Sequence, residues 1–171
     1  MASYCDIAPG HPFHGPYHDT EYGFPIDDDN QLFERLVLEI NQAGLSWLTI
    51  LKKREVFREA YGGFDIAKVA RLSPEKLLRN ERIIRNRLKV AAAIENARRL
   101  RKLGSFAQWL EAHHPLTKDE WVKLFKKTFV FTGGEITNSF LMSIGYLPGA
   151  HDESCPVYRK ALRAGARWRS A

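Results

Sequence analysis

Long hydrophobic runs are missing from this sequence of 171 residues. No apolar stretch approaches the ~18–20 residues that a helix needs to cross a bilayer, so we expect no membrane partner. Residues 1–23 are interrupted by Cys, His, Pro and Asp where a signal peptide requires a continuous apolar segment, which predicts a cytoplasmic protein. Hydrophobic residues still make up 44% of the chain, enough for one buried core. We therefore predict a single domain over residues 1–171 that acts as a monomer.

Cysteine is also scarce, because only Cys5 and Cys155 are present and they lie near opposite ends of the chain. Two cysteines exclude a disulfide-rich scaffold and leave three interpretations: unrelated thiols, one long-range disulfide, or two ligands of the same metal ion. Twelve residues separate Cys5 from His18 and three separate His151 from Cys155, a set of ligand types that zinc favours. With six histidines in the chain, such spacing also arises by chance.

Signals for β-strands are nearly absent, and the sequence predicts an all-α fold. The best strand candidate, residues 129–131, is only three residues long. Residues 1–25, rich in Gly, Pro, His and Asp, are predicted to form an ordered loop, and residues 27–29 offer caps for the first helix. Apolar residues recur at helical spacing over 32–44, 46–61, 66–70, 75–79, 81–103, 106–113, 118–127, 134–144 and 156–163.

Acidic residues are outnumbered, since 26 Lys and Arg against 20 Asp and Glu give a net charge of +6. This excess favours a polyanionic partner. The predicted helix 81–103 is strongly basic on one side, and residues 156–171 form a basic C-terminal tail. The tail is either an extension that contacts a polyanion or a solvated face, and the second interpretation is favoured.

One carboxylate of the predicted helix 32–44 stands out by its position. With Leu32 placed at zero on a helical wheel of roughly 100° per residue, the apolar residues of the helix fall between about 40° and 140°. Glu39 falls about 20° on the other side of Leu32 and therefore borders the buried face, whereas Glu34 is predicted to face solvent. A carboxylate at the edge of a core costs free energy unless it is paired, and such positions are enriched in function. Tyr17, Tyr22 and Trp47 could surround it as an aromatic box for a flat cation, or be ordinary core residues.

Several motifs stand together in the order in which one enzyme family carries them. They are Tyr17-His18-Asp19, Glu21-Tyr22-Gly23, Leu32-Phe33-Glu34, Leu38-Glu39, Gln42-Ala43-Gly44-Leu45-Ser46-Trp47 and Lys53-Arg54-Glu55. On these residues the sequence resembles the DNA-3-methyladenine glycosylase I family over residues 5–155. The stretch 42–55 is the most specific part of the match.

The resemblance implies an all-helical DNA glycosylase with a helix-hairpin-helix motif, whose partner is double-stranded DNA containing alkylated bases and whose reaction is the excision of 3-methyladenine. It implies one structural zinc ion (Zn2+) per chain that joins the two ends of the sequence. The implied ligands are Cys5, His18, His151 and Cys155. The family's base-recognising glutamate falls on Glu39 and its base-binding aromatic residues on Tyr17 and Trp47, with Tyr22 assigned to the same pocket. The DNA-binding hairpin corresponds to residues 126–133, with Lys126, Lys127, Thr132 and Gly133 at the DNA.

The sequence departs from the family pattern at three places. Ile7 stands where the family has the tryptophan of Cys-x-Trp, so one aromatic wall of the pocket is missing. Tyr22 replaces the tryptophan of Glu-Trp-Gly. The usual Lys-Lys-Arg-Gly-Phe of the hairpin is shortened to residues 126–129 with Thr128 in it, which removes a cation and a glycine. These departures affect the base preference and the contact with DNA.

The expected reaction is hydrolysis without strand cleavage, because no lysine stands where lyase relatives carry a Schiff-base lysine. The competing function is a non-catalytic, zinc-containing DNA-binding module of the same fold, against which the joint presence of Glu39, Tyr17 and Trp47 argues. A catalytic zinc is disfavoured because four protein ligands leave no open position for a substrate.

Overall fold

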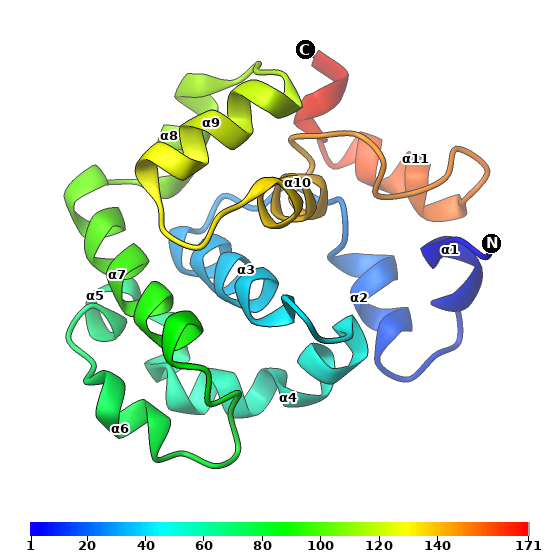
Figure 1. Ribbon diagram of the computed structural model, residues 1–171. Helices are drawn as coiled ribbons and strands as arrows, with labels where there is room; N and C mark the ends of the chain where they lie inside the picture. The colour runs from blue at the N-terminus through cyan, green and yellow to red at the C-terminus, as the bar shows by residue number, and fades with distance from the viewer. Residues whose placement is uncertain (171) are drawn as a thin grey trace.

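Helix α3 (Asp29–Gln42) runs through the centre of the molecule, and the other helices are arranged around it (Figure 1). The computed structural model describes residues 1–170, and all regular structure in that range is helical, as predicted. The remaining elements are α1 (Tyr4–Ile7), α2 (His14–Thr20), α4 (Trp47–Ala60), η1 (Gly62–Phe64), α5 (Ile66–Val69), α6 (Pro74–Leu78), α7 (Arg87–Leu103), α8 (Phe106–His113), α9 (Lys118–Thr128), α10 (Gly134–Ser143), α11 (Pro156–Arg163) and η2 (Arg167–Ser170).

The central position of α3 follows from its sequence and its partners. Asp28 caps the helix, since its Oδ1 accepts a hydrogen bond from the backbone N–H of Gln31 at 2.9 Å. Every residue from 32 to 41 is buried, because α4, α7, α8 and α10 all pack against this helix. A helix buried on all sides is a rigid support for any side chain that it carries.

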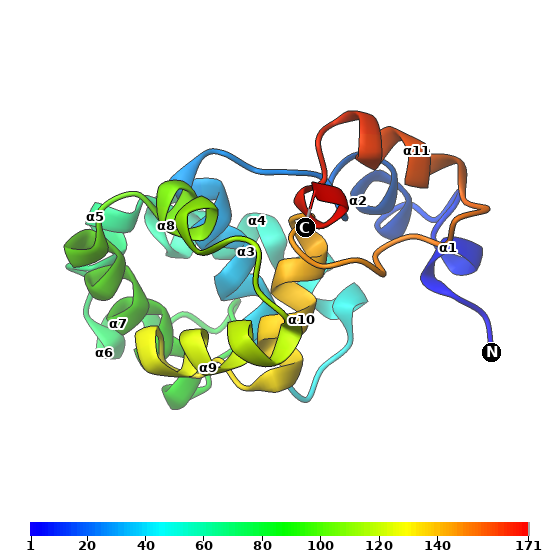
Figure 2. The same cartoon turned by 90° about the horizontal axis from the view of Figure 1, so that it is seen from above.

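The two ends of the sequence lie at the same end of the molecule. Viewed from above, α1, α2 and α11 gather at one end, α5 to α9 form the other, and α3 and α10 lie between them (Figure 2). The Ser3 hydroxyl donates to Asp152 Oδ2 at 2.6 Å and ties the first residues to the segment before α11. No helix within residues 1–170 is long and apolar enough to cross a membrane.

The prediction of a loop over residues 1–25 is wrong, because α1 and α2 lie within it. The backbone N–H of Ser3 donates to Asp6 Oδ2 at 2.7 Å, so Asp6 stabilises the start of α1. In α2, Pro16 falls in the first helical turn, where the missing N–H costs no hydrogen bond. The proline and glycine residues of this region are therefore compatible with short helices.

The start of one predicted helix also needs correction. The helix predicted from residue 81 begins at Arg87, because Asn86 caps it by accepting from the backbone N–H of Lys89 at 3.1 Å. In agreement with the predicted all-α fold, residues 129–131 form no strand and belong to the loop between α9 and α10. Phe129 is buried there against the aromatic rings of α8 and α9, so its hydrophobicity reflects packing in the core.

The prediction that Glu34 faces solvent is also wrong, since Glu34 is only 8% exposed. Arg54 and Arg58 of α4 both donate to its carboxylate, and Arg54 also binds Glu21, which follows α2. These guanidinium groups hold the pKa of Glu34 and of Glu21 below the usual range although burial opposes them. The helical-wheel prediction for Glu34 is wrong because arginines of α4 cover the side of α3 that was expected to face solvent.

We expect Glu34→Ala to destabilise the protein by about 3 kcal/mol, because the change leaves the Arg54 guanidinium partly unpaired in a position where its side chain is 13% exposed. The matched control is Glu55→Ala, which removes a carboxylate 77% exposed that pairs with Arg58, and should cost about 0.5 kcal/mol. Urea unfolding at pH 7 measures both. Equal losses for the two variants would show that the buried cluster adds nothing to stability.

Candidate active site and metal centre

A pocket of about 260 Å³ opens beside the C-terminal half of α3. Its volume suits a ligand smaller than a drug-sized molecule. The lining comes from α1, α2 and the turn after it, α3, α4 and α10, which are far apart in the sequence. The lining residues are Tyr4, Tyr17, Tyr22, Glu39, Gln42, Trp47 and Ser139.

Glu39 is the only acidic residue in that lining, and it is 5% exposed, as its predicted place at the edge of the core requires. No donor among residues 1–170 forms a hydrogen bond with its carboxylate. Burial raises the pKa of Glu39 to about 7, and the Arg35 guanidinium one turn earlier opposes the shift only in part. The carboxylate is therefore poised between its two protonation states and is free to accept hydrogen bonds from a ligand.

Aromatic rings form most of the rest of the pocket wall. The Tyr17 ring lies 5.2 Å from that of Trp47 and 5.7 Å from that of Tyr22, measured between centroids, and the two tyrosine rings are stacked. The Tyr17 hydroxyl and Trp47 Nε1 are buried without a hydrogen-bond partner in the described structure. Burial raises the pKa of Tyr17, so this phenol keeps its proton. Buried donors without partners are costly, and a ligand in the pocket can relieve that cost.

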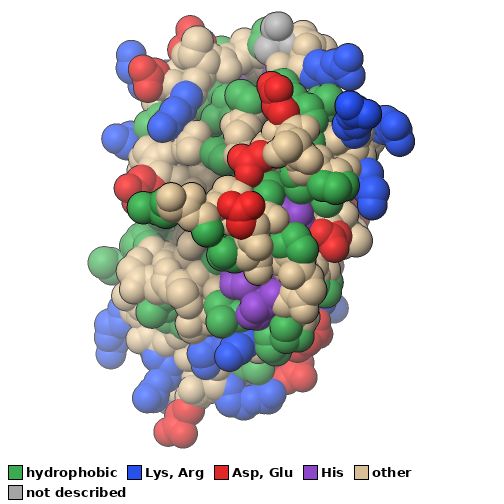
Figure 3. Space-filling view, turned by 90° about the vertical axis from the view of Figure 1, so that its right-hand side faces the viewer, with side chains coloured by type: hydrophobic (Ala, Val, Ile, Leu, Met, Phe, Trp, Pro, Cys, Tyr) green, Lys and Arg blue, Asp and Glu red, His purple; other side chains and the backbone are tan. Residues whose placement is uncertain are grey.

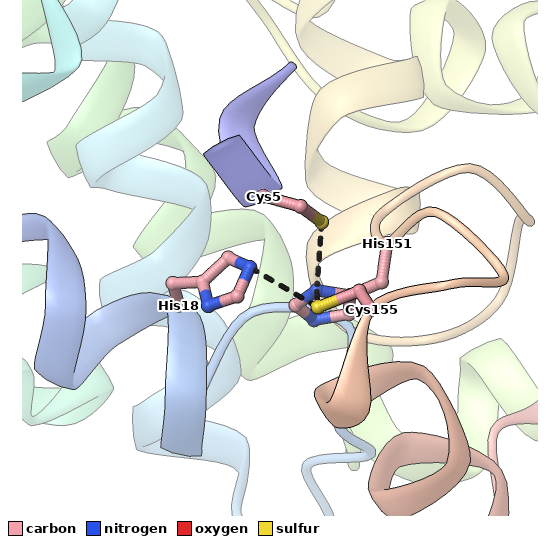
Figure 4. Close-up of side chains that lie close together, drawn as sticks. All are labelled: Cys5, His18, His151 and Cys155. Carbon is pink, nitrogen blue, oxygen red and sulfur yellow. Dashed lines mark hydrogen bonds between the residues drawn. The ribbon is translucent and has the colours of Figure 1, made fainter. Parts of the chain in front are cut away.

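The four predicted metal ligands come together at the end of the molecule where α1, α2 and α11 meet. The ligand atoms of Cys5, His18, His151 and Cys155 all lie within 4.8 Å of one another, and Figure 4 shows them converging. Cys5 Sγ is 3.6 Å from His151 Nδ1, and Cys155 Sγ is 3.8 Å from His18 Nε2. A tetrahedral zinc ion with ordinary bond lengths needs its ligand atoms about 3.3–3.8 Å apart. The group has the size and composition of a metal site.

The second nitrogen of each histidine is already used. His18 Nδ1 donates to Asp19 Oδ1 at 2.7 Å, and His151 Nε2 donates to the backbone oxygen of Tyr22 at 2.6 Å. Each of these bonds fixes the ring orientation and leaves the other nitrogen, which faces the cysteines, with its lone pair. This carboxylate or carbonyl support behind the imidazole is typical of metal-binding histidines.

The metal site and the pocket share Tyr22. Its carbonyl holds His151, while its ring lines the pocket and stacks on Tyr17. Both sites sit at the end of the molecule that carries α1 and α11. In the space-filling view of this end, histidine side chains reach the surface among apolar and acidic ones, with lysine and arginine mostly towards the rim (Figure 3).

A wider groove of about 630 Å³ borders the pocket and shares Glu39, Gln42 and Ser139 with it. Its far wall is the start of α10, whose N-cap Gly133 offers no side chain to the first backbone N–H groups of the helix. Such a helix start presents N–H donors to an anion. The turn between α3 and α4 forms the groove's other wall and carries Leu45, which is exposed.

The residues predicted to bind DNA lie in three different environments. Gly133 lines the groove. Thr132 is buried, with its hydroxyl donating to the Phe125 carbonyl at 3.1 Å, so only its backbone is available there. Lys126 and Lys127 are exposed on the last turn of α9.

Sequence reasoning assigned no role to three lining residues, Tyr4, Gln42 and Ser139. Gln42 lies three positions after Glu39 on the same helix face, a signal that could have found it. Tyr4 and Ser139 reach the pocket only through long-range packing, which no local pattern reports.

Comparison with known proteins gives a consistent result. The family model for methyladenine glycosylase matches residues 8–121. The DNA-3-methyladenine glycosylase of Haemophilus influenzae is 38% identical over 166 residues, which cover 82% of this chain and 89% of that protein.

Two solved structures have a similar fold. One is a variant of 3-methyladenine DNA glycosylase I in complex with 3-methyladenine, with a TM-score of 0.82 and 30% identity over 91% of this chain and 97% of the other. The second, 3-methyladenine DNA glycosylase I from Staphylococcus aureus, has a TM-score of 0.78 and 30% identity over 90% of this chain and 95% of its own. The resemblance seen in the sequence is confirmed, and the chain belongs to the methyladenine glycosylase family.

Proposed function

We propose that this protein removes 3-methyladenine from alkylated double-stranded DNA by hydrolysing the N-glycosidic bond, without cutting the strand. The observation that carries this proposal is the buried Glu39 carboxylate, which faces an aromatic pocket and has no donor within the described residues. Membership of the methyladenine glycosylase family supports the same substrate.

The pocket chemistry suits a flat, cationic base. A glycosylase must swing the nucleotide out of the duplex and replace the stacking that the base loses. Trp47, Tyr17 and Tyr22 supply aromatic surface, and the unpartnered Tyr17 hydroxyl and Trp47 N–H supply donors. The positive charge of 3-methyladenine favours the ionised form of Glu39, whereas neutral adenine gains less from that carboxylate. Selectivity thus arises from charge and stacking together.

Little acid catalysis is needed for this substrate. When the bond between C1′ and the base breaks, its electron pair passes to the positively charged ring, and the base leaves as a neutral molecule. Glu39 holds and orients the departing base, and water adds to C1′ while its proton passes to solvent. A strong nucleophile on the protein is unnecessary.

The groove beside the pocket is our candidate for the DNA backbone. We interpret α9, the loop over residues 129–133 and α10 as a helix-hairpin-helix motif. Free backbone N–H groups at the start of α10 suit a phosphate, and Lys126 and Lys127 add positive charge on α9. Gly133 and the backbone of Thr132 complete the contact.

A zinc ion bound by Cys5, His18, His151 and Cys155 would have a structural role. Four protein ligands close a tetrahedron and leave no position for a substrate, and the ion would supply a cross-link between the ends of the chain. The histidine orientations, each fixed from behind by an oxygen acceptor, support this ligand set.

Glu39→Gln should lower the rate of 3-methyladenine release by about 100-fold, because it removes the negative charge while keeping the shape. The control is Glu55→Gln, which changes an exposed carboxylate on α4. Single-turnover assays on methylated duplex DNA, with freed bases identified by chromatography, measure both.

Wild-type kcat/KM should rise with pH through about 7 and that of the Glu39→Gln variant should not. A variant as active as wild type would remove Glu39 from the mechanism, and DNA binding without base release by wild type would favour the non-catalytic module.

The same variant should be more stable than wild type at alkaline pH. Folding raises the pKa of Glu39, so wild-type stability falls as the pH rises from ~4.5 through about 7, where the folded protein must give up the proton. At pH 9 the variant should gain roughly 3 kcal/mol relative to its difference from wild type at pH 4. Urea unfolding at the two pH values tests this, and a constant difference would contradict the pKa shift.

Cys155→Ser should lose zinc and stability together. The native protein should contain one zinc ion per chain, and loss of the ion should lower Tm by roughly 10 °C because the ends of the chain are released. Ser154→Ala, an exposed change beside it, is the control and should keep both. Metal analysis and thermal unfolding measure the two effects. Native protein purified without zinc would refute the structural role.

A further inference from the structure

One aromatic wall of the pocket, expected to be missing because Ile7 replaces a tryptophan, is supplied by a different residue. Ile7, which stands where the family has a tryptophan, is 53% exposed and is not part of the pocket lining. Tyr4, from the first turn of α1, lines the pocket instead. We infer that Tyr4 is a base-binding wall of the pocket and determines how tightly a cationic base is held. This inference rests on the proposed function.

Tyr4 extends a continuous chain of aromatic contacts around the pocket. Its ring lies 5.4 Å from that of Tyr22 in an edge-to-face arrangement, and Tyr22 in turn stacks on Tyr17, which contacts Trp47. All four rings line the same cavity as Glu39. Edge-to-face contacts of this kind fix ring orientation as well as adding attraction. The wall is therefore continuous from α1 to α4.

Neighbouring contacts position Tyr4 from three directions. Its hydroxyl shares a hydrogen bond of 2.9 Å with His14 Nδ1. The residues on either side of it are both tied to the segment before α11, Ser3 through Asp152 and Cys5 through the contact of its sulfur with His151. Since His151 also holds the Tyr22 carbonyl, one anchor positions two walls of the pocket. Tyr4 is thus held in place before any ligand arrives, which lowers the entropy cost of binding.

The ring has a physical role that Ile7 cannot supply from its exposed position. A cationic base next to an aromatic ring gains a cation–π attraction, which strengthens where water is excluded. The same ring covers the α1 side of the pocket, and excluding water strengthens the attraction between the base and the Glu39 carboxylate. Removing the Tyr4 ring should therefore weaken binding of the cationic base more than truncating the exposed Ile7 side chain of α1.

The test compares Tyr4→Leu, Tyr4→Phe and the control Ile7→Ala in the full-length, zinc-containing protein. Isothermal titration with 3,9-dimethyladeninium, which keeps the positive charge that the free base loses on release, gives Kd, and single-turnover release from methylated duplex DNA gives kcat/KM. We expect Tyr4→Leu to weaken Kd about 10-fold and to lower kcat/KM by a similar factor. Tyr4→Phe, which keeps the ring, should stay within about 3-fold of wild type, and Ile7→Ala should match wild type.

The outcomes separate this inference from the proposed function. If wild type binds 3,9-dimethyladeninium and releases 3-methyladenine and Tyr4→Leu behaves like it, Tyr4 is not a wall and the proposed function stands. If wild type neither binds this cation nor releases 3-methyladenine, the proposed function fails and the inference fails with it. Zinc content is measured for each variant. Should Tyr4→Leu lose the ion, Tyr4→Trp decides: a larger ring facing a cavity of about 260 Å³ must change Kd, and an unchanged Kd overturns the inference.

Discussion

The burial of the Glu39 carboxylate is the constraint on which the rest of the site depends. An acidic group without a donor among residues 1–170 is unfavourable in a core, and the charge of Arg35 offsets only part of that cost. The group can persist only if the backbone beneath it cannot move to relieve it. Helix α3 meets this requirement because its residues 32–41 are all buried among other helices. The cost of burying this carboxylate therefore falls where a ligand can offset it.

Two glutamates on this one helix show how position alone divides structural from functional chemistry. Glu34 meets the guanidinium groups of Arg54 and Arg58, and its pKa falls. Glu39 lies five residues later against aromatic rings, and its pKa rises. The Glu34 carboxylate stabilises the packing of α3 against α4. The Glu39 carboxylate costs stability, which the packing of α3 offsets.

The sequence predicted the helical fold, most helix positions and the buried border position of Glu39, because each depends on apolar periodicity within one helix. It also grouped Cys5, His18, His151 and Cys155, which the structure brings together. Features that arise between elements were out of reach. Glu34 became buried through arginines of α4, and Tyr4 reached the pocket because the segment before α11 holds both of its neighbours. The helices in residues 1–25 were hidden because Pro16 looks like a helix breaker anywhere except in a first turn.

The Cys and His cluster draws one pair of ligands from each end of the sequence, and this has a consequence during synthesis. Translation delivers Cys5, His18 and the tyrosines of the pocket first, whereas His151 and Cys155 follow only after helices α3 to α10 have been made. Until then Tyr22 and the neighbours of Tyr4 lack the contacts with His151 and Asp152 that hold them in the folded structure. A nascent chain that ends before His151 would carry Glu39 without a finished pocket around it, so the pocket can be completed only after that segment has been made.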